Sequence, residues 1–232
     1  MRYLILFSVV IFSCTLENPN ENIYLPQKFD ILSLGDSYTI GQGVCDECSY
    51  PRQLIDSFSV AHIRDTFNLE VIAQTGWTTN SLINNIDTLE LEKKDVVTLL
   101  IGVNNQFWGL PFNQYETQFE ELINISIGLT KSQTSDDVLV ISIPDWAYTP
   151  AGQTYNPEFT SEQINLYNEF AENYCLENEI SYVYITDITR LGLEQPELVS
   201  IDGLHPSEIA YKLFVERIYP VSYTHLTLPT KA

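Results

Sequence analysis

Basic side chains are scarce in this chain. Its 232 residues include 11 Lys and Arg but 31 Asp and Glu, which gives a formal net charge of −20. A nucleic-acid-binding protein carries positive charge gathered on one face, so we exclude nucleic acid as a partner. Strong acidity favours solubility and repels polyanions, but it identifies no substrate. The apolar content of 44% and the 14 tyrosines indicate a single globular domain.

Sequence motifs for cofactors and metals are also missing. The sequence has neither a P-loop nor a dinucleotide-binding glycine motif, and it has no cluster of His and Cys residues. Cys45 and Cys48 form a lone C-x-x-C pair, without the second pair that a structural zinc site needs. We therefore predict that the protein uses no cofactor and no metal.

Three of the four cysteines fit structural roles. Asp46 and Glu47 lie between Cys45 and Cys48, where their charges disfavour a thiolate and so argue against a redox site. We predict a small structural disulfide between Cys45 and Cys48 instead. Cys175 lies on an amphipathic segment, and we expect a buried, unreactive thiol there.

The apolar run near the N-terminus, residues 4–12, is too short to span a bilayer, which takes about 20 residues. It has the length of a signal-peptide core and ends at Ser13 and Cys14. A cysteine directly after a small residue at this place resembles a bacterial lipoprotein signal. We therefore predict that Cys14 is the lipidated first residue of the mature protein. The alternatives are an ordinary secretory signal and a buried N-terminal strand.

These patterns divide the chain into segments. Residues 1–14 are the predicted signal, residues 15–27 are a flexible tether rich in Asn, Glu and Pro, and residues 28–220 are the folded domain. Residues 221–232 show no helical period and resemble, after back-translation, a sequencing adapter read in frame, so we interpret them as an artefact. We expect an exported protein, in the periplasm or as an outer-membrane or cell-surface lipoprotein, that contacts a membrane only through its lipid anchor.

Strand-like and helix-like segments alternate through the predicted domain. Short apolar or β-rich runs predict five strands, at residues 29–34, 69–73, 95–101, 138–143 and 182–185. Helical periodicity and proline starts predict helices at residues 50–58, 78–91, 115–129 and 161–178, and from Pro206 onward. This alternation predicts the α/β class, as a three-layer α/β/α sandwich. Its five-stranded parallel sheet is expected to have the flavodoxin-like order 2-1-3-4-5.

In such a sheet the ligand crevice lies at the carboxyl ends of strands one and three. Ser37 directly follows the first predicted strand, within Gly-Asp-Ser-Tyr, and Asn104 follows the third. The fold and the polar residues therefore indicate the same crevice. Asp202 and His205 lie near the end of the chain, within Asp-Gly-Leu-His-Pro.

A serine, a histidine and an aspartate are the parts of a nucleophile–base triad. Asp202 can accept a hydrogen bond from one ring nitrogen of His205, which leaves the other nitrogen to take the proton of Ser37. His62 lies in a polar stretch and His225 in the excluded tail, so His205 has no rival as the base. Taken singly, each residue also has a structural interpretation, as a helix cap or a loop contact.

Ester hydrolysis also needs donors for a developing oxyanion. The side-chain amide of Asn104 and the backbone N–H groups of Ser37 and Gly76 are the candidates for this oxyanion hole, each at the end of a predicted strand. The structural alternatives are a turn glycine at position 76 and a loop-stabilising amide at position 104. The presence of all three candidate donors at the ends of predicted strands favours the catalytic interpretation.

These segments resemble the GDSL/SGNH hydrolase superfamily, whose four motif blocks supply Ser, Gly, Asn and His. The matching positions here are Ser37, Gly76, Asn104 and His205, with Asp202 as the third triad member. The resemblance covers about residues 29–219 and is strongest to bacterial lysophospholipase-like and carbohydrate-esterase-like members. It implies the SGNH hydrolase fold and a serine esterase or acylhydrolase that forms an acyl-enzyme.

Two positions depart from the family pattern. Tyr38 replaces the leucine of the family name, and Asn105 stands where many members have aspartate. Neither position carries the chemistry, so we expect an intact mechanism and an altered substrate pocket.

The expected substrate is a small ester, either an acetylated carbohydrate or a lysophospholipid or other short acyl ester. Four residues that follow the third and fourth predicted strands are the candidates for contacts with it: Phe107, Trp108, Asp145 and Trp146. One alternative is a catalytically degenerate module of the same fold that binds a glycan without cleaving it. A flavodoxin-like cofactor binder is disfavoured, because no phosphate-binding loop follows the first strand.

Overall fold

The computed structural model describes the backbone of residues 25–227 and the side chains of residues 25–223. The predicted signal segment, Cys14 and most of the predicted tether lie outside the described residues. Within the described part of the chain, no helix combines the length and the apolar character that a membrane span requires.

One parallel sheet forms the centre of the molecule, in the order β2-β1-β3-β4-β5. Its strands are β1 (Lys28–Gly35), β2 (Thr66–Ala73), β3 (Val96–Leu100), β4 (Val138–Ile141) and β5 (Ser181–Val183). Every residue of β3 and β4 is buried, as expected for central parallel strands covered on both faces. The predicted α/β sandwich with strand order 2-1-3-4-5 is confirmed.

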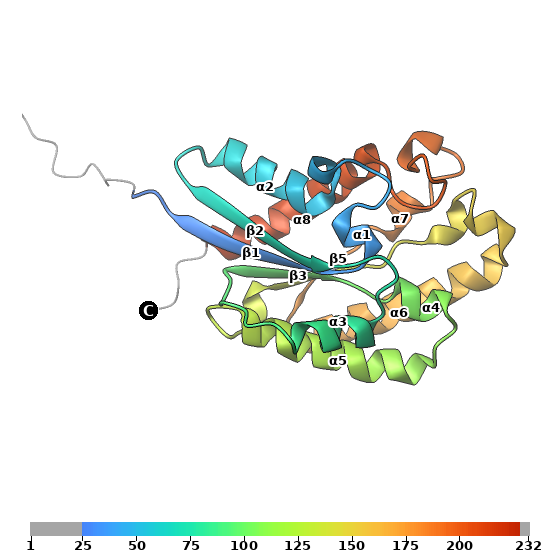
Figure 1. Cartoon of the computed structure of the whole chain (residues 1–232), viewed down its shortest axis with the longest axis horizontal. Helices are drawn as coiled ribbons and strands as arrows, with labels where there is room; N and C mark the ends of the chain where they lie inside the picture. Colours follow the sequence, from blue (N-terminus) through green and yellow to red (C-terminus); the bar gives the residue numbers. More distant parts are fainter. Residues whose placement is uncertain (1–24, 228–232) are drawn as a thin grey trace, which may run out of the picture.

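Helices cover both faces of this sheet (Figure 1). On one face, α2 (Tyr50–Ala61) packs against α8 (Glu208–Thr227). On the other face lie α3 (Thr79–Ile86), α5 (Phe112–Leu129) and α6 (Pro157–Glu177). Each helix turns an apolar stripe toward the sheet, which is how two helical layers and one sheet come to share a single core.

Short helices follow directly after the strands and were not predicted. They are α1 (Ser37–Ile40), α4 (Val103–Phe107) and α7 (Thr186–Thr189). Single 3₁₀ turns occupy residues 46–48, 135–137, 146–148, 152–154 and 196–198. A helix of four or five residues is too short to show an amphipathic period, so the sequence pattern gives no signal for it. Figure 1 shows α1 and α4 at the end of the sheet to which the arrowheads point.

Helix boundaries differ from the predicted ones where local hydrogen bonds decide them. Helix α3 ends at Ile86 rather than at residue 91, because the Thr88 hydroxyl donates to the Asn85 carbonyl there and Leu89 lies outside the buried stripe. Helix α8 starts at Glu208 rather than at Pro206, because Pro206 instead forms an isolated bridge with Val199.

The last helix continues into the segment that we excluded from the fold. Helix α8 runs to Thr227 with Pro220 inside it, the Ser222 side chain is buried, and the Tyr223 ring stacks on His62 with centroids 5.1 Å apart. The expectation that residues after 220 have no link to the preceding helix is therefore wrong for residues 221–227. Their origin as an adapter stays a prediction.

Candidate active site

Three residues from distant parts of the chain meet at the carboxyl edge of the sheet. Ser37 opens α1 directly after β1, and Asp202 and His205 lie in the loop that leads into α8. The Ser37 Oγ lies 3.0 Å from His205 Nε2, although 168 positions separate the two residues. On the other side of the ring, His205 Nδ1 lies 2.7 Å from Asp202 Oδ2. The three side chains thus form one continuous hydrogen-bonded chain.

Glycine and aspartate place Ser37 at this edge. A Cβ on Gly35 would lie 2.1 Å from Thr39 Oγ1 and 2.4 Å from the Leu100 carbonyl, so only glycine allows the chain to leave β1 here. The Asp36 side chain then accepts a hydrogen bond from the Tyr38 N–H at 3.0 Å and caps α1. The cap and the turn together fix the Ser37 hydroxyl above the end of the sheet.

Hydrogen bonds hold Asp202 as an ionised carboxylate. Its Oδ1 accepts from the Ser200 hydroxyl at 2.7 Å, the Leu204 N–H at 2.9 Å and the His205 N–H at 3.0 Å. Partial burial opposes ionisation, but these hydrogen bonds and the one from the His205 ring outweigh it and lower the pKa of Asp202 to about 2. An ionised Asp202 accepts a hydrogen bond from the Nδ1–H of His205, which leaves Nε2 as the acceptor for the Ser37 proton.

Gly43 packs against this carboxylate from the loop after α1, a contact that the sequence did not reveal. Its φ is +88°, and a Cβ there would lie 2.3 Å from Ser200 Oγ and 2.9 Å from Asp202 Oδ2. The position therefore needs glycine both for its backbone conformation and for the close approach. The only sequence signal was the glycine itself.

Replacing Gly43 by alanine is expected to lower kcat/KM for an ester by about 10²-fold, because the new methyl group must displace Asp202 or Ser200 and misalign His205. Steady-state kinetics of the variant measures this loss. Gly109→Ala is the matched control, since Gly109 has φ +62° but open space at its Cβ position. Equal losses in the two variants, or no loss at Gly43, would contradict the assigned contact.

The predicted oxyanion donors line one cavity beside Ser37. Asn104 lies in α4, which begins after Gly102, and its Nδ2 donates to the Trp77 carbonyl at 3.0 Å and to Asp36 Oδ2 at 3.3 Å. These two acceptors fix the plane of the amide at the cavity. Gly76, in the turn after β2 with φ +80°, lines the same cavity. The structure therefore brings Ser37, Gly76 and Asn104 together as predicted.

The Asp36 carboxyl behind Asn104 is fully buried. Burial, opposed by hydrogen bonds from the Tyr38 N–H and the Asn104 amide, raises the pKa of Asp36 to about 7. The folded state thus disfavours the ionised form, which the unfolded chain adopts above about pH 3.8. The contribution of the protonated Asp36 carboxyl to the free energy of unfolding is fully present below about pH 3.8. It is lost as the pH rises through about 7.

The free energy of unfolding of the wild type is therefore expected to fall, relative to Asp36→Asn, between pH 5 and pH 8.5. The fall amounts to roughly 1.4 kcal/mol for each pH unit between pH 5 and the folded-state pKa of about 7. Urea denaturation of both proteins at the two pH values measures it. The comparison uses the change with pH, because asparagine also alters a hydrogen bond to Asn104. A difference between the two proteins that stays constant with pH would refute the expectation.

The cavity beside Ser37, the candidate catalytic cavity, has a volume of ≈240 Å³. Its walls are formed by Ser37, Tyr38, Gln42, Thr75, Gly76, Val103, Asn104, Phe107, Trp108, Trp146, Leu204 and His205. Three of the four predicted substrate contacts are among them: Phe107, Trp108 and Trp146. The lining thus includes both polar and aromatic side chains.

Comparison with known proteins agrees with this geometry. A family model described as the GDSL-like lipase/acylhydrolase family matches residues 33–213, most of the chain. The chain belongs to this family. It is a carboxylic ester hydrolase. No curated protein sequence matches it significantly.

Solved structures of esterases share the fold of this acylhydrolase. The psychrotrophic esterase EstA from Pseudoalteromonas sp. has a TM-score of 0.64 at 18% identity, covering 86% of this chain and 100% of that one. TesA has a TM-score of 0.66 at 15% identity, with 84% and 99% covered. The acetylxylan esterase Axe2 from Geobacillus stearothermophilus has a TM-score of 0.63 at 14% identity, with 87% and 95% covered. At these identities the likeness concerns the fold.

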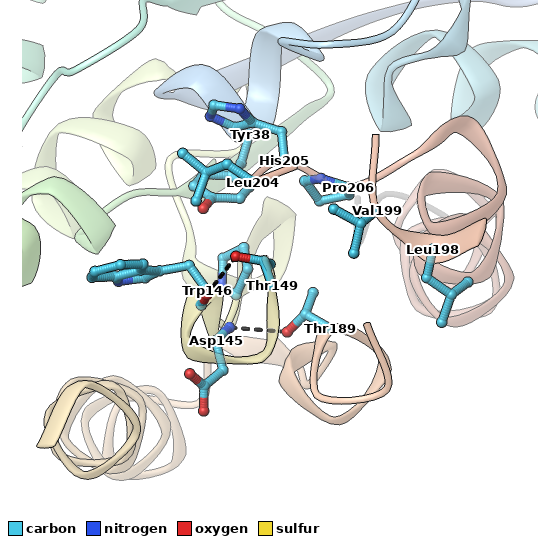
Figure 2. A pocket seen from close by; sticks show the side chains of 11 residues that line it. Tyr38, Asp145, Trp146, Thr149, Thr189, Leu198, Val199, Leu204, His205 and Pro206 are labelled. Atoms are coloured by element: carbon cyan, nitrogen blue, oxygen red, sulfur yellow. Dashed lines mark hydrogen bonds between the residues drawn. The ribbon is translucent and has the colours of Figure 1, made fainter. Parts of the chain in front are cut away.

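Asp145 does not contact the catalytic cavity of the acylhydrolase, so its predicted substrate contact is corrected. Figure 2 shows its carboxylate directed away from Tyr38 and His205. The carboxylate is fully buried and accepts hydrogen bonds from Arg190 Nε at 2.9 Å and from the Ser161 hydroxyl at 2.6 Å. A buried carboxylate needs such partners, and they hold it on the far side of the loop that carries Trp146.

The two departures from the family pattern have distinct surroundings. The Tyr38 ring packs on the His205 ring, with centroids 5.0 Å apart, and lines the cavity. Asn105 is buried instead, where its Oδ1 accepts from the Thr79 N–H at 3.0 Å and its Nδ2 donates to the Thr79 hydroxyl at 2.7 Å. Asn105 thus joins α4 to the start of α3, and of the two residues only Tyr38 lines the cavity.

The cysteines of the described residues occupy structural positions. Cys45 and Cys48 are joined by a disulfide across the first 3₁₀ turn, in the loop that carries Gly43. Cys175 is a buried free thiol, and burial raises its pKa to about 12. Within residues 25–223, no group of three or more His, Cys, Asp or Glu side chains is placed to hold a metal ion.

Proposed function

We propose that this acylhydrolase cleaves small carboxylic esters by two-step acyl transfer, with Ser37 as the nucleophile, His205 as the general base and Asp202 as the residue that orients the base. The observation that carries the proposal is the hydrogen-bonded chain with distances of 3.0 Å and 2.7 Å on the two sides of the imidazole. Nucleophile and base within hydrogen-bond reach, with a third group that orients the base, are the signature of such a mechanism.

In the first step, Ser37 Oγ attacks the ester carbonyl carbon while its proton passes to His205 Nε2. Asp202 stabilises the imidazolium that forms. The carbonyl oxygen becomes an oxyanion, which accepts hydrogen bonds from the backbone N–H groups of Ser37 and Gly76 and from the Asn104 amide. Asn104 Nδ2 gives up its long 3.3 Å hydrogen bond to Asp36 for this. When the tetrahedral intermediate collapses, the C–O bond to the alcohol breaks and the alcohol takes the proton from Nε2.

In the second step, water attacks the acyl group that is now bound to Ser37. His205 Nε2 removes a proton from this water and returns it to Ser37 Oγ as the acyl–oxygen bond breaks. The carboxylic acid leaves, and the enzyme regains its starting state. All proton transfers pass through one imidazole nitrogen, and neither step requires a cofactor.

The substrate classes that remain are an acetylated carbohydrate and a lysophospholipid or other short acyl ester. The cavity volume of ≈240 Å³ lies below the usual range of ligand pockets and favours a small acyl group. The alternative of a glycan-binding module without activity is disfavoured, because the triad residues have catalytic spacing.

We also propose that the protein acts outside the cytoplasm, anchored through Cys14. The Cys45–Cys48 disulfide supports an oxidising location, because disulfides persist in exported proteins and are rare in the cytosol.

A panel of p-nitrophenyl esters tests the proposed activity. We expect kcat/KM to fall at least tenfold from the acetate to the dodecanoate, because the small cavity cannot enclose a long chain. The release of p-nitrophenolate at constant pH measures each rate against a blank without enzyme. Rates equal to the blank for every ester would refute the proposed function, and a preference for dodecanoate would refute the short acyl group.

A further inference from the structure

An exposed cluster of aromatic rings borders the catalytic cavity. Phe107 lies at its centre, with ring centroids 5.0 Å from Trp108, 5.4 Å from Trp146 and 5.8 Å from Tyr155. We call Phe107, Trp108 and Tyr155 the aromatic rim. Their exposed fractions are 37%, 62% and 56%, so water covers much of three adjacent rings. Apolar surface gathered in this way beside a cavity is typical of a binding site.

The aromatic rim rests on a fixed base. Trp146 is 4% exposed, and its indole Nε1 donates to Gln106 Oε1 at 2.8 Å. Its ring also contacts Tyr155, with centroids 5.2 Å apart. The rim residues come from α4 and from the loop before α6, two segments that the chain brings together only by folding. A ligand that stacks on the rim therefore meets rings whose positions are largely set beforehand.

The rim adjoins the place from which the alcohol leaves. His205 Nε2 protonates the departing alcohol, so this part of the substrate must lie beside His205. Trp146 and His205 both line the catalytic cavity and a small void of ≈10 Å³ (Figure 2). The rings of Phe107 and Tyr155 contact Trp146, so the rim lies next to this part of the cavity.

Polar side chains also line the catalytic cavity. Gln42 and Thr75 are among its lining residues, and the Thr75 hydroxyl donates to Gln42 Oε1. Both are at least partly exposed, so they can exchange this hydrogen bond for one to a ligand hydroxyl. A cavity lined by aromatic rings and by polar side chains suits a molecule with an apolar C–H face and hydroxyl groups at its edge, which describes a pyranose ring.

We propose that the aromatic rim binds a sugar ring, so that the alcohol part of the substrate is a carbohydrate and the acyl part is of acetyl size. Tyr155 and Trp108 are then the residues that determine specificity, through stacking on the sugar. This inference rests on the proposed function, because it uses the direction in which His205 releases the alcohol.

A lipid substrate fits the described cavities less well. The catalytic cavity of ≈240 Å³ is small, and its lining includes the polar side chains of Gln42 and Thr75. The larger groove of ≈860 Å³ runs between α2 and α8 and shares no lining residue with the catalytic cavity. An acyl chain in that groove would not lead to Ser37.

The test compares two acetyl esters that differ only in their alcohol: partially O-acetylated xylotriose and ethyl acetate. Tyr155→Ala is expected to raise KM about tenfold for the acetylated trisaccharide and to change kcat/KM for ethyl acetate less than twofold. Trp108→Ala also removes a ring from the cavity wall, so we expect it to raise KM for the trisaccharide about tenfold and to affect ethyl acetate less strongly. Phe159→Ala is the matched control, because Phe159 is 55% exposed but does not line the cavity. This control variant should alter the hydrolysis of neither substrate. Acetate release measures all of these rates.

An unchanged KM for the trisaccharide in both rim variants would overturn the proposal. If the rim variants lose activity only toward palmitoyl lysophosphatidylcholine, the proposal is overturned in favour of a lipid substrate. Titration of Ser37→Ala with unacetylated xylotriose tests the rim without turnover: we expect a saturable change in tryptophan fluorescence that Trp108→Ala abolishes, and no change would count against the rim. Absence of ethyl acetate hydrolysis by the wild type would instead refute the proposed function, and sugar binding would then identify a glycan-binding module.

Discussion

Replacing Ser37 by alanine is expected to lower kcat for p-nitrophenyl acetate by roughly 10⁴–10⁶-fold, because the Ser37 hydroxyl is the one that bonds to the base His205. The residual rate should reflect binding and the oxyanion donors alone. Steady-state kinetics with a large amount of the variant measures the loss. A variant that keeps more than 1% of the wild-type kcat would contradict the assignment of Ser37 as the nucleophile.

The loss at Ser37 should occur without loss of the fold. The side chain is 4% exposed and its hydroxyl bonds to His205, so removal of one oxygen leaves the apolar core untouched. Ser200→Ala is the matched control: it removes a buried hydroxyl that donates to Asp202 and takes no part in the chemistry. We expect it to lower kcat no more than about tenfold, since three other hydrogen bonds still hold Asp202.

Asp202→Asn is expected to lower kcat by roughly 10⁴-fold while leaving the geometry of the site intact. An amide has the shape of the carboxyl, but its NH₂ group facing His205 turns Nδ1 into an acceptor. The ring proton then moves to Nε2, where it blocks the transfer from Ser37. Kinetics with p-nitrophenyl acetate measures the loss, and a decrease of less than tenfold would contradict the orienting role of Asp202.

The pH dependence of stability provides a second readout. With its pKa lowered to about 2, Asp202 is ionised at every pH at which an ester assay is practical. Titration of Asp202 itself should therefore cause no change in the wild-type kcat between pH 5 and pH 9. The same carboxylate contributes stability above its ordinary pKa of 3.8, and this contribution is lost as the pH falls through about 2. A wild type that loses no stability relative to Asp202→Asn over this acidic range would contradict the ionised state assigned to Asp202.

The sequence predicted the sheet because its strands are nearly continuous apolar runs. The predicted segments 95–101 and 138–143 contain β3 and β4, and every side chain of these two strands is buried. A continuous apolar run is typical of such central parallel strands. Strand order followed from the alternation with helices, since parallel strands need crossovers. The same reasoning placed Ser37 and Asn104 at one edge before any distance was known.

Other features depend on approaches in space that leave no local pattern. Gly43 is one of several loop glycines, and only the folded chain shows that it touches Asp202 and Ser200. Tyr155 lies in an irregular segment and joins the aromatic rim only because α4 and the start of α6 lie side by side. Pairwise contacts of this kind are set by tertiary packing and have no period in the sequence.

Asp145 shows the opposite failure. Its position soon after β4 placed it at the right edge of the sheet, but no sequence pattern indicates which way its side chain points. Arg190 and Ser161, 45 and 16 positions away, supply the hydrogen bonds that turn it inward. The end of a strand thus determines where a residue lies, whereas its hydrogen-bond partners determine the direction in which its side chain points.

The most direct test of the account is covalent labelling with a fluorophosphonate, which reacts with an activated serine hydroxyl. Digestion and mass spectrometry of the labelled wild type should locate the added phosphonyl group on Ser37, and Asp202→Asn should be labelled far more slowly because its base cannot accept the proton. Labelling of any other residue at the same rate, or equal rates in the wild type and Asp202→Asn, would contradict the claim that His205 and Asp202 activate Ser37.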